Sequence, residues 1–473
     1  MDFTSYTIKK LKIKCKELGI KGYSNKNKSD LIQLISNKLN KEDNKEDNKK
    51  ENNEILSILS QNKSTHSNEL TNIIETIQSK LKTKKFIDLF CGIGGFHTAL
   101  HHFNFECLLA CDIDKACREV YKNNYGVTPV EDVRKIIPEE LEDFSILCGG
   151  FPCQSFSNGG KKKAFDDERG LLFDEIMRIA KVKQPELMFL ENVKHIRKVS
   201  EGKVLEYILD KLDKHNYYVQ TFDISPHQFG IPQQRERVYF VCIHKSIYHN
   251  KKLELNIPPN KPIHLETFLE ETPDPKYNIS GDILNTLNAW ETMIQKFPKN
   301  EKISPTILAN EFYKSYTEEE FEQLPNWKQD YIKKNKPLYN KYKKDWDEWY
   351  NQNKDILGKR EIYAKLEWQT GPIKDNDSIF NHFIQFRQSG IRVKKAHYFP
   401  TLVAISQIPI YGKKKRYITP RECARIQSFP DTFKIDPIDK NSYKQFGNCV
   451  NVDNVKTIML MTFESFISPV IIT

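Results

Sequence analysis

The stretch 146–160, ILCGGFPCQSFSNGG, contains the residue with the most distinctive surroundings, Cys153. The apolar run 144–147 predicts a short buried strand, and the two glycines and the proline after it are expected to end that strand abruptly. Cys153 would then lie on a loop at the carboxyl end of a strand, where open α/β sheets bind their ligands. A lone cysteine is more often a small buried apolar residue. The glutamine, serines and asparagine that follow it favour an exposed functional loop and a nucleophilic thiol.

Two further stretches could complete a reaction site. PELMFLENV predicts a buried strand that ends in Glu191, and GIPQQRERVYFV places Arg235 and Arg237 just before another strand. Alternation at the strand entrance would point the two arginines the same way. Taken singly, the glutamate is more often a surface carboxylate, and an arginine pair more often contacts an acid or a phosphate. Together with Cys153 they would supply a nucleophile, a proton donor or acceptor, and a clamp for an oxyanion or phosphate.

A glycine turn near residue 90 indicates a nucleotide-like ligand. A β-like run at 86–90 is followed by Gly92, Gly94 and Gly95 and then by a predicted helix, as in the first unit of a Rossmann-like domain. The next predicted strand ends in Asp112, about 20 residues on, where an acid commonly binds ribose hydroxyls. This pattern alone permits either a nicotinamide dinucleotide or S-adenosylmethionine.

Predicted strands and helices alternate around these residues. The alternation continues through a strand at 187–190 to another at 238–243. Such a rhythm predicts an α/β fold whose mostly parallel sheet has helices on both faces. The sheet would bring the cysteine, the glutamate and the arginines to one edge.

Composition restricts the class of protein. At 473 residues, the chain is long enough for two to four domains of about 100 to 200 residues each. Its 73 Lys and Arg against 63 Asp and Glu give a net charge of +10, which favours nucleic acid as a partner but also fits a lysine-rich solvated surface. Ten cysteines without a CxxC pair indicate a reduced, intracellular protein without a zinc site. Neither a signal peptide nor an apolar run of about 18 residues is evident, so we expect a soluble protein and no membrane partner.

The first 40 residues predict a small helix–loop–helix unit rich in lysine. Apolar residues recur at helical spacing from Ile8 to Leu18, and a second apolar run follows Ser29, the expected N-cap. The unit resembles the SAP motif, a short DNA-binding helix–loop–helix; a plain helical hairpin that docks on the main domain is the alternative. Residues 41–54 read as a charged, flexible linker, and 55–83 as a helical connector whose role the sequence leaves open.

As a set, the motifs of the main domain resemble those of the cytosine-5 DNA methyltransferases of bacterial restriction-modification systems. The resemblance runs from about Phe86 to the C-terminus, apart from a long insert. It implies a Rossmann-like methyltransferase domain formed by 84–245 and 417–473, with a target recognition domain at 246–416. The motifs occur in family order: DLFCGIGGF, CDID, ED, GGFPCQSFS, DERGLLF, ENV, QQRER, TPRECARIQSFPDTF and KQFGNCV.

The resemblance implies roles for the catalytic residues. Cys153 would add to carbon 6 of cytosine, Glu191 would hydrogen-bond ring nitrogen 3, and Arg237 would bind the carbonyl oxygen. Arg235 would rather contact a phosphate. The addition converts an unreactive aromatic ring into an enamine whose carbon 5 can attack a methyl sulfonium. The base must be flipped out of the duplex, and residues 155–165 are expected to form a mobile lid over it.

For the cofactor, the resemblance implies S-adenosylmethionine. Phe90 would stack on the adenine, Asp112 would bind the ribose and Asp132 the adenine amine, while the glycine turn would approach the methionine part. Ile113 and Asn448 would also lie at the cofactor. The family more often has glutamate at the position of Asp112 and a small residue at that of Cys449. After KQFGNCV, the closing helix is expected to pack beside the first glycine turn.

The insert between Ile243 and Arg416 is too long for a loop and is best read as a domain. It interleaves lysines with aromatic residues, which suits DNA, although much of 333–354 could equally be a solvated helical face. Thr401 with Leu402 resembles the Thr-Leu signature of the recognition domain. We expect DNA contacts from this region and from the Cys153 loop at these residues: Gln154, Ser155, Lys161, Lys162, Arg387, Arg392, Lys394, Lys395 and Thr401.

Three alternatives remain open at this point. An RNA cytosine-5 methyltransferase belongs to the same family, but the Cys-Phe-Thr stretch of that branch is missing here. A catalytically inactive DNA-binding relative would not need Cys153, Glu191 and Arg237 together. A nicotinamide oxidoreductase would leave the Pro-Cys loop unexplained. We expect a monomeric cytoplasmic enzyme that acts on double-stranded DNA in a short specific sequence, and a cognate restriction endonuclease could accompany it.

Overall fold

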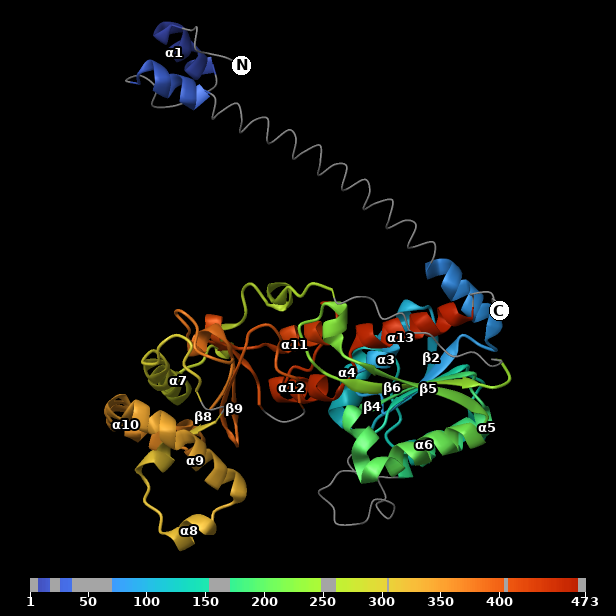
Figure 1. The fold of residues 1–473 in the computed structure, drawn as a ribbon. Coiled ribbons are helices and arrows are strands. Elements are labelled where there is room, and N and C mark those ends of the chain that lie inside the picture. Colours follow the sequence, from blue (N-terminus) through green and yellow to red (C-terminus); the bar gives the residue numbers. More distant parts are fainter. Residues whose placement is uncertain are drawn as a thin grey trace, which may run out of the picture. The chain divides into compact units, whose positions relative to one another are not determined.

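The computed structural model describes residues 7–17, 26–35, 70–152, 171–247, 261–303, 306–403 and 407–466 (Figure 1). Contacts divide the chain into two compact units, 1–76 and 77–473. Cys153 and its neighbours Gln154, Ser155, Lys161 and Lys162 lie outside the described residues, as do the linker 41–54 and most of the connector 55–83. Residues 70–80 of that connector are helical.

The N-terminal unit is a pair of short helices with a core of its own. Helix α1 (Ile8–Glu17) and the helical residues 28–35 enclose four buried side chains: Leu11, Cys15, Leu31 and Ile35. The second helix is capped by Asn27, whose Oδ1 accepts from the backbone N of Asp30 at 2.9 Å, so the expected cap at Ser29 was wrong by two residues. Ile8 is 45% exposed and lies outside this core.

The first sheet of the larger unit has six strands in the order β2-β1-β3-β4-β6-β5. Strands β1 to β4 are parallel, and β6 runs antiparallel to both β4 and β5. The chain moves from β1 outward to β2 and then returns to β3 on the other side of β1, which makes the β1/β3 boundary a topological switch point. The strands are β1 (Lys85–Leu89), β2 (Glu106–Cys111), β3 (Ile146–Gly150), β4 (Leu187–Val193), β5 (Tyr217–Ile224) and β6 (Arg237–His244).

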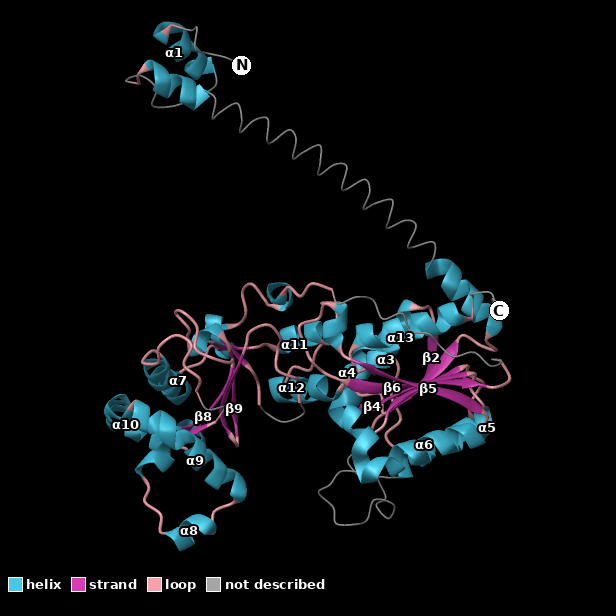
Figure 2. Cartoon of the chain, viewed as in Figure 1, coloured by secondary structure: helices cyan, strands magenta, loops and turns pink. Residues whose placement is uncertain are grey.

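Helices cover both faces of this sheet, as the sequence predicts (Figure 2). Helices α5 (Leu171–Lys183) and α6 (Lys203–Lys214) lie on one face, and α3 (Gly95–His102) and α13 (Val452–Ser465) pack together on the other. Phe103 after α3 and Phe463 of α13 make an edge-to-face contact with ring centroids 5.2 Å apart. The closing helix therefore packs with α3 on this face of the first sheet. Helix α4 (Lys115–Tyr125) follows β2, and α11 (Pro420–Ile426) and α12 (Asp439–Asn448) precede α13.

Strand β3 extends further than the sequence predicts. We expected the two glycines to end it, but Gly149 and Gly150 pair with Leu190 and Glu191 of β4. A side chain at Gly149 would place its Cβ 3.3 Å from the carbonyl oxygen of Leu89. The glycines are present because neighbouring backbones approach closely, and the strand stops at Gly150, three residues before Cys153.

Residues 261–417 build a second layer with a separate hydrophobic core. Its mixed sheet has the order β12-β11-β9-β10-β8-β7 and packs against α7 (Gly281–Ile294) and α10 (Lys343–Gly358). Trp290, Trp346 and Trp349 are buried together in this core. The 279–410 core shares no residue with the main core at 87–242. The other elements are β7 (Ile307–Leu308), α8 (Glu318–Glu322), α9 (Asn326–Lys341), β8 (Lys365–Gln369), β9 (Phe383–Arg387), β10 (Gly390–Lys394), β11 (Ile410–Tyr411) and β12 (Arg416–Tyr417).

In the described part of the chain, no helix combines the length and the apolar character that a membrane crossing requires.

Candidate active site

Glu191, Arg237 and the glycine turn, all predicted site features, lie at one edge of the first sheet. Strands β1, β3 and β4 are parallel, so the glycine turn after β1, residues 151–152 after β3 and Glu191 near the end of β4 lie at the same edge. Strand β6 runs the opposite way, so its first residue, Arg237, also lies at this edge and pairs with Val193. Because β6 is antiparallel to β4, the residues just before β6 lie at the same edge as the residues that follow β1 and β3.

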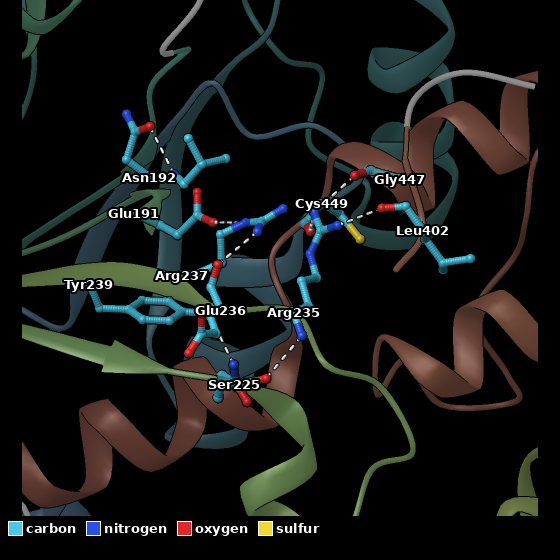
Figure 3. Close-up of polar contacts among 12 residues, drawn as sticks. Glu191, Asn192, Ser225, Arg235, Glu236, Arg237, Tyr239, Leu402, Gly447 and Cys449 are labelled. Carbon is cyan, nitrogen blue, oxygen red and sulfur yellow. Dashed lines mark hydrogen bonds and ion pairs between the residues drawn. The ribbon is translucent and has the colours of Figure 1, made fainter. Parts of the chain in front are cut away.

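Glu191 and Arg237 form an ion pair at this edge (Figure 3). Oε1 of Glu191 lies 3.0 Å from Nε of Arg237, and the side chains are 11% and 16% exposed. Burial raises the pKa of Glu191 above its ordinary 4.5, although the charges of Arg237 and Arg235 act in the opposite direction. The carboxyl is thus suited to hold a proton at higher pH than an ordinary glutamate.

The base of the Pro-Cys loop lies against this pair. Gly150 is paired with Glu191, and a Cβ at Gly150 would lie 3.5 Å from Oε2 of Glu191. Asn192 donates from Nδ2 to the carbonyl oxygen of Phe151 at 2.9 Å. Only Pro152 separates Phe151 from Cys153 in the sequence. This contact of Asn192 was not predicted from the sequence, although the position of Asn192 directly after Glu191 in the ENV motif could have indicated it.

Arg235 does not have the surroundings we expected. A phosphate contact requires an accessible guanidinium, but this residue is 3% exposed. Nη1 donates to the carbonyl oxygen of Leu402 at 2.8 Å, and Nη2 donates to those of Gly447 and Cys449 at 2.8 and 3.1 Å (Figure 3). Burial lowers the pKa of Arg235 to about 10. Strand alternation predicted that both arginine side chains would point the same way. Arg235 lies before the first residue of β6, however, and its partners differ from the carboxylate that pairs with Arg237.

The glycine turn is held by an acid and a tyrosine. The backbone N of Gly92 donates to Oδ2 of Asp112 at 2.8 Å, and burial raises the pKa of that carboxyl from 3.8. Gly94 has φ +88°, and a Cβ there would lie 2.3 Å from the ring of Tyr125, whose hydroxyl bonds the Gly94 carbonyl oxygen at 2.9 Å. The contact of Tyr125 with this turn was not predicted, because no local pattern in the sequence places the end of α4 beside it.

The remaining predicted cofactor residues are Phe90, Ile113, Asp132 and Asn448. Phe90 adopts φ +55°, an uncommon conformation for a residue other than glycine. Ile113 is 72% exposed, which is unusual for a large apolar side chain. Asp132 accepts from Arg134 in an ion pair of 2.8 Å, and this partner lowers the pKa of Asp132 below 3.8. Asn448 is exposed at the end of α12.

The closing segment packs directly beside the glycine turn. A Cβ on Gly95 would lie 2.5 Å from Cγ2 of Val450, so only glycine allows this approach. The thiol of Cys449 contacts the carbonyl oxygen of Phe446 at 3.5 Å, and burial raises its pKa to about 12. The variant cysteine is thus a buried packing residue.

Three of the predicted DNA contacts share one face of the second sheet. Arg387 lies on β9, and Arg392 and Lys394 lie on β10; the antiparallel register puts all three on the face opposite the buried Ile384 and Val393. Arg392 is paired with Glu367 at 2.6 Å and Arg387 donates to Gln407 at 3.2 Å.

The hydroxyl of Thr401 is used within the protein, because it donates to the carbonyl oxygen of Gln234 at 2.6 Å. Its predicted DNA contact would need another group, such as its backbone N–H.

Comparison with known proteins identifies the family. The model of the C-5 cytosine-specific DNA methylase family matches residues 84–463. The type II methyltransferase M.HhaI of Haemophilus parahaemolyticus is 28% identical over 82% of this chain and 96% of its own length. M1.ScrFI of Lactococcus lactis subsp. cremoris is 32% identical over 79% of this chain and 76% of its own length.

A solved structure described as a DNA modification methyltransferase encoded within an E. coli prophage has the same fold. It aligns with a TM-score of 0.52 at 20% identity, over 81% of this chain and 99% of its own. With its glycine turn, the end of β3 and the Glu191–Arg237 pair at one sheet edge, this chain belongs to the C-5 cytosine-specific DNA methylase family.

Proposed function

We propose that this enzyme transfers a methyl group from S-adenosylmethionine to carbon 5 of a cytosine flipped out of double-stranded DNA, through a covalent adduct with Cys153. The observation that carries the proposal is the buried Glu191–Arg237 pair, with Oε1 and Nε 3.0 Å apart, next to the strand that leads into the Pro-Cys loop. A carboxyl and a guanidinium side by side match the ring nitrogen and the carbonyl oxygen on one edge of cytosine.

Atoms and electrons balance over the proposed steps. The thiolate of Cys153 forms a bond to carbon 6 while Glu191 supplies a proton to ring nitrogen 3, which leaves an enamine. When bound, S-adenosylmethionine supplies an electrophilic methyl group, which carbon 5 of the enamine takes up as S-adenosylhomocysteine leaves. The proton on carbon 5 then passes to water, the thiolate of Cys153 is expelled, and the proton on ring nitrogen 3 returns to Glu191, which restores the aromatic ring. Arg237 binds the carbonyl oxygen throughout. A raised pKa suits Glu191 to this role.

The glycine turn fits the proposed cofactor. Gly94 and Gly95 have no room for a Cβ, so the backbone of the turn stays open to a ligand. The backbone N of Gly92 donates to Asp112, which holds the turn next to this acid. The second carboxylate oxygen of Asp112 accepts from Asp114 N at 2.8 Å, so the acid is fixed while retaining lone pairs for ribose hydroxyls. The exposed Ile113 offers an apolar surface to the adenine. Phe90, Asp132 and Asn448 would complete the site.

We assign DNA recognition to the second layer. Residues 246–416 would form the target recognition domain, and 84–245 with 417–473 the catalytic domain. The face that carries Arg387, Arg392 and Lys394 would meet the duplex, with phosphates replacing the internal partners of the two arginines. Lysines of the Cys153 loop would add phosphate contacts. Flipping costs a few kcal/mol, which these contacts must supply.

The N-terminal unit would act as a tethered DNA-binding module. Its described lysines Lys9, Lys10, Lys16, Lys26 and Lys28 are exposed, and neutralising phosphates would raise affinity without reading sequence. We further propose that the enzyme is a cytoplasmic monomer that protects DNA against a cognate restriction endonuclease.

Bisulfite sequencing of random-sequence duplex DNA, incubated with the purified protein and S-adenosylmethionine, tests the function. Methylation at one cytosine within one short recurring sequence is the expected result. Absence of methylation from a protein that binds the cofactor would overturn the DNA substrate, and incubation with transfer RNA would then test the RNA alternative.

A further inference from the structure

Arg235 is a buried cation whose partners are backbone carbonyls from distant parts of the chain. Nη1 donates to Leu402, and Nη2 donates to both Gly447 and Cys449. Its own backbone N donates to Oγ of Ser225 at 2.9 Å. Through these hydrogen bonds, one side chain connects three segments: the residues before β6, residues 399–402 of the inserted region, and the end of α12.

Two further contacts fasten the same segments. The backbone N of Phe399 donates to the carbonyl oxygen of Pro232 at 2.6 Å, and Thr401 donates to that of Gln234. We call the residues 232–235, 399–402 and 447–449 the joint. It connects the strand entrance of β6 with the segment by which the inserted layer returns.

The joint lies between the two parts of the proposed site. On one side, Arg235 is two residues before Arg237, which is paired with Glu191. On the other side, Phe399 packs on Phe383 of β9 with ring centroids 4.8 Å apart. Phe383 is on the same sheet face as Arg387 and Lys394, because antiparallel register pairs it with Lys394. The joint is therefore linked through Phe399 to the sheet that carries Arg387 and Lys394, and along the chain to Arg237.

We propose that Arg235 is a positioning residue: its guanidinium sets the distance between the DNA-reading face of the inserted layer and the Glu191–Arg237 pair. The inference rests on the proposed methyl transfer to DNA. A planar guanidinium has donors directed at several carbonyls at once, whereas a lysine offers one compact ammonium. A lysine cannot therefore hold Leu402 and Gly447 together as Arg235 does. Small displacements of reacting groups can cost about 10²-fold in rate.

The test uses the full chain, with a duplex that carries the site found by bisulfite sequencing. Arg235→Lys should lower the single-turnover methylation rate by about 10-fold or more, and should narrow the difference in rate between this duplex and one with a single altered base pair. The rate is measured at saturating S-adenosylmethionine, because Asn448 of the joint also belongs to the proposed cofactor site.

Arg416→Lys is the matched control. Arg416 is also 3% exposed, and its guanidinium pairs with Glu422 at 2.5 and 3.0 Å instead of with the joint. Both variants should unfold at lower temperature. Only Arg235→Lys should lose rate and discrimination when assayed well below its unfolding temperature.

A second measurement separates position from folding. Four residues with charged or titratable side chains act on Glu191 among the described elements: Arg235, Arg237, Tyr239 and Cys449. Arg235→Gln removes a positive charge that favours ionised Glu191, so the alkaline fall of the rate should move to higher pH. Arg235→Lys keeps the charge and should leave that pH unchanged.

The outcomes are distinct. Wild-type rate and discrimination in Arg235→Lys would overturn the inference, as would equal losses in Arg416→Lys or pH profiles that do not differ between the lysine and glutamine variants. A wild-type enzyme that methylates no DNA would instead overturn the proposed function.

Discussion

Nε of Arg237 lies 3.0 Å from Oε1 of Glu191, and this pair joins the start of β6 to the end of β4. Each residue keeps the other oriented at a site with little solvent. The pair also sets an electrostatic balance, since burial raises the pKa of Glu191 while the guanidinium opposes the rise. Its consequences can be measured.

Glu191→Gln should reduce the single-turnover rate by about 10² to 10⁴, the usual contribution of a general acid. Because burial raises the pKa of Glu191, its proton is retained above pH 4.5 and lost as the pH rises through the raised value. The wild-type rate should show this alkaline fall, and the glutamine variant should lack it. Glu236→Gln is the control: its side chain is 59% exposed, and the rate should change by about twofold at most. An unchanged alkaline fall in Glu191→Gln would contradict the assignment.

Cys153→Ala should abolish methyl transfer and leave sequence-specific DNA binding, because the thiol forms the covalent bond and adds little to recognition. Methyl incorporation and fluorescence anisotropy would measure the two properties. Cys107→Ala is a suitable control, since burial raises the pKa of Cys107 to about 12 and makes it a poor nucleophile. Turnover by Cys153→Ala would remove the nucleophile from the mechanism.

Gly94→Ala should weaken binding of S-adenosylmethionine by more than about 1.4 kcal/mol, or tenfold. The added Cβ would lie 2.3 Å from the Tyr125 ring, which stacks on His97, so the turn must deform. Gly126→Ala separates this clash from backbone strain, because Gly126 also has a positive φ, +74°, but no atom within 4 Å of the added Cβ. That variant should cost about 1 to 2 kcal/mol in stability and keep its cofactor affinity. Calorimetric titration of both variants with S-adenosylmethionine measures the difference. Equal cofactor affinities in Gly94→Ala and Gly126→Ala would show that the glycine turn tolerates a side chain.

Deletion of residues 1–54 should weaken DNA binding at low salt and leave the catalytic rate unchanged. The slope of log K against log[salt] should become shallower by about 0.9 for each phosphate that the shortened protein no longer neutralises. Replacing the exposed Lys9, Lys10 and Lys16 by glutamine in the full chain should reproduce part of this effect, while the Leu11 and Cys15 core stays intact. An unchanged salt slope in both proteins would contradict a DNA-binding role for the N-terminal unit.

Much of the larger unit was predictable because the signals are local. Contiguous apolar runs indicated β1, β2, β4 and β6 to within a few residues, since a strand buried on both faces needs apolar residues throughout. The glycine turn was predictable for another local reason, because glycine adopts positive φ without strain. The predicted end of β3 was wrong. In the sequence, Gly149 and Gly150 look like residues that end a strand, but in the structure they let the backbones of neighbouring strands approach.

The sequence by itself indicated the proposed reacting groups, since Cys153, Glu191 and Arg237 stand out by type and by their place next to predicted strands. Only the tertiary structure decided the partners of Arg235. Two arginines of one short motif are chemically identical in a sequence, and their partners, a carboxylate for Arg237 and three backbone carbonyls for Arg235, come from residues up to 214 positions away. Partners at such separations are brought together by the direction of β6 and the return of the inserted layer, which no local pattern encodes.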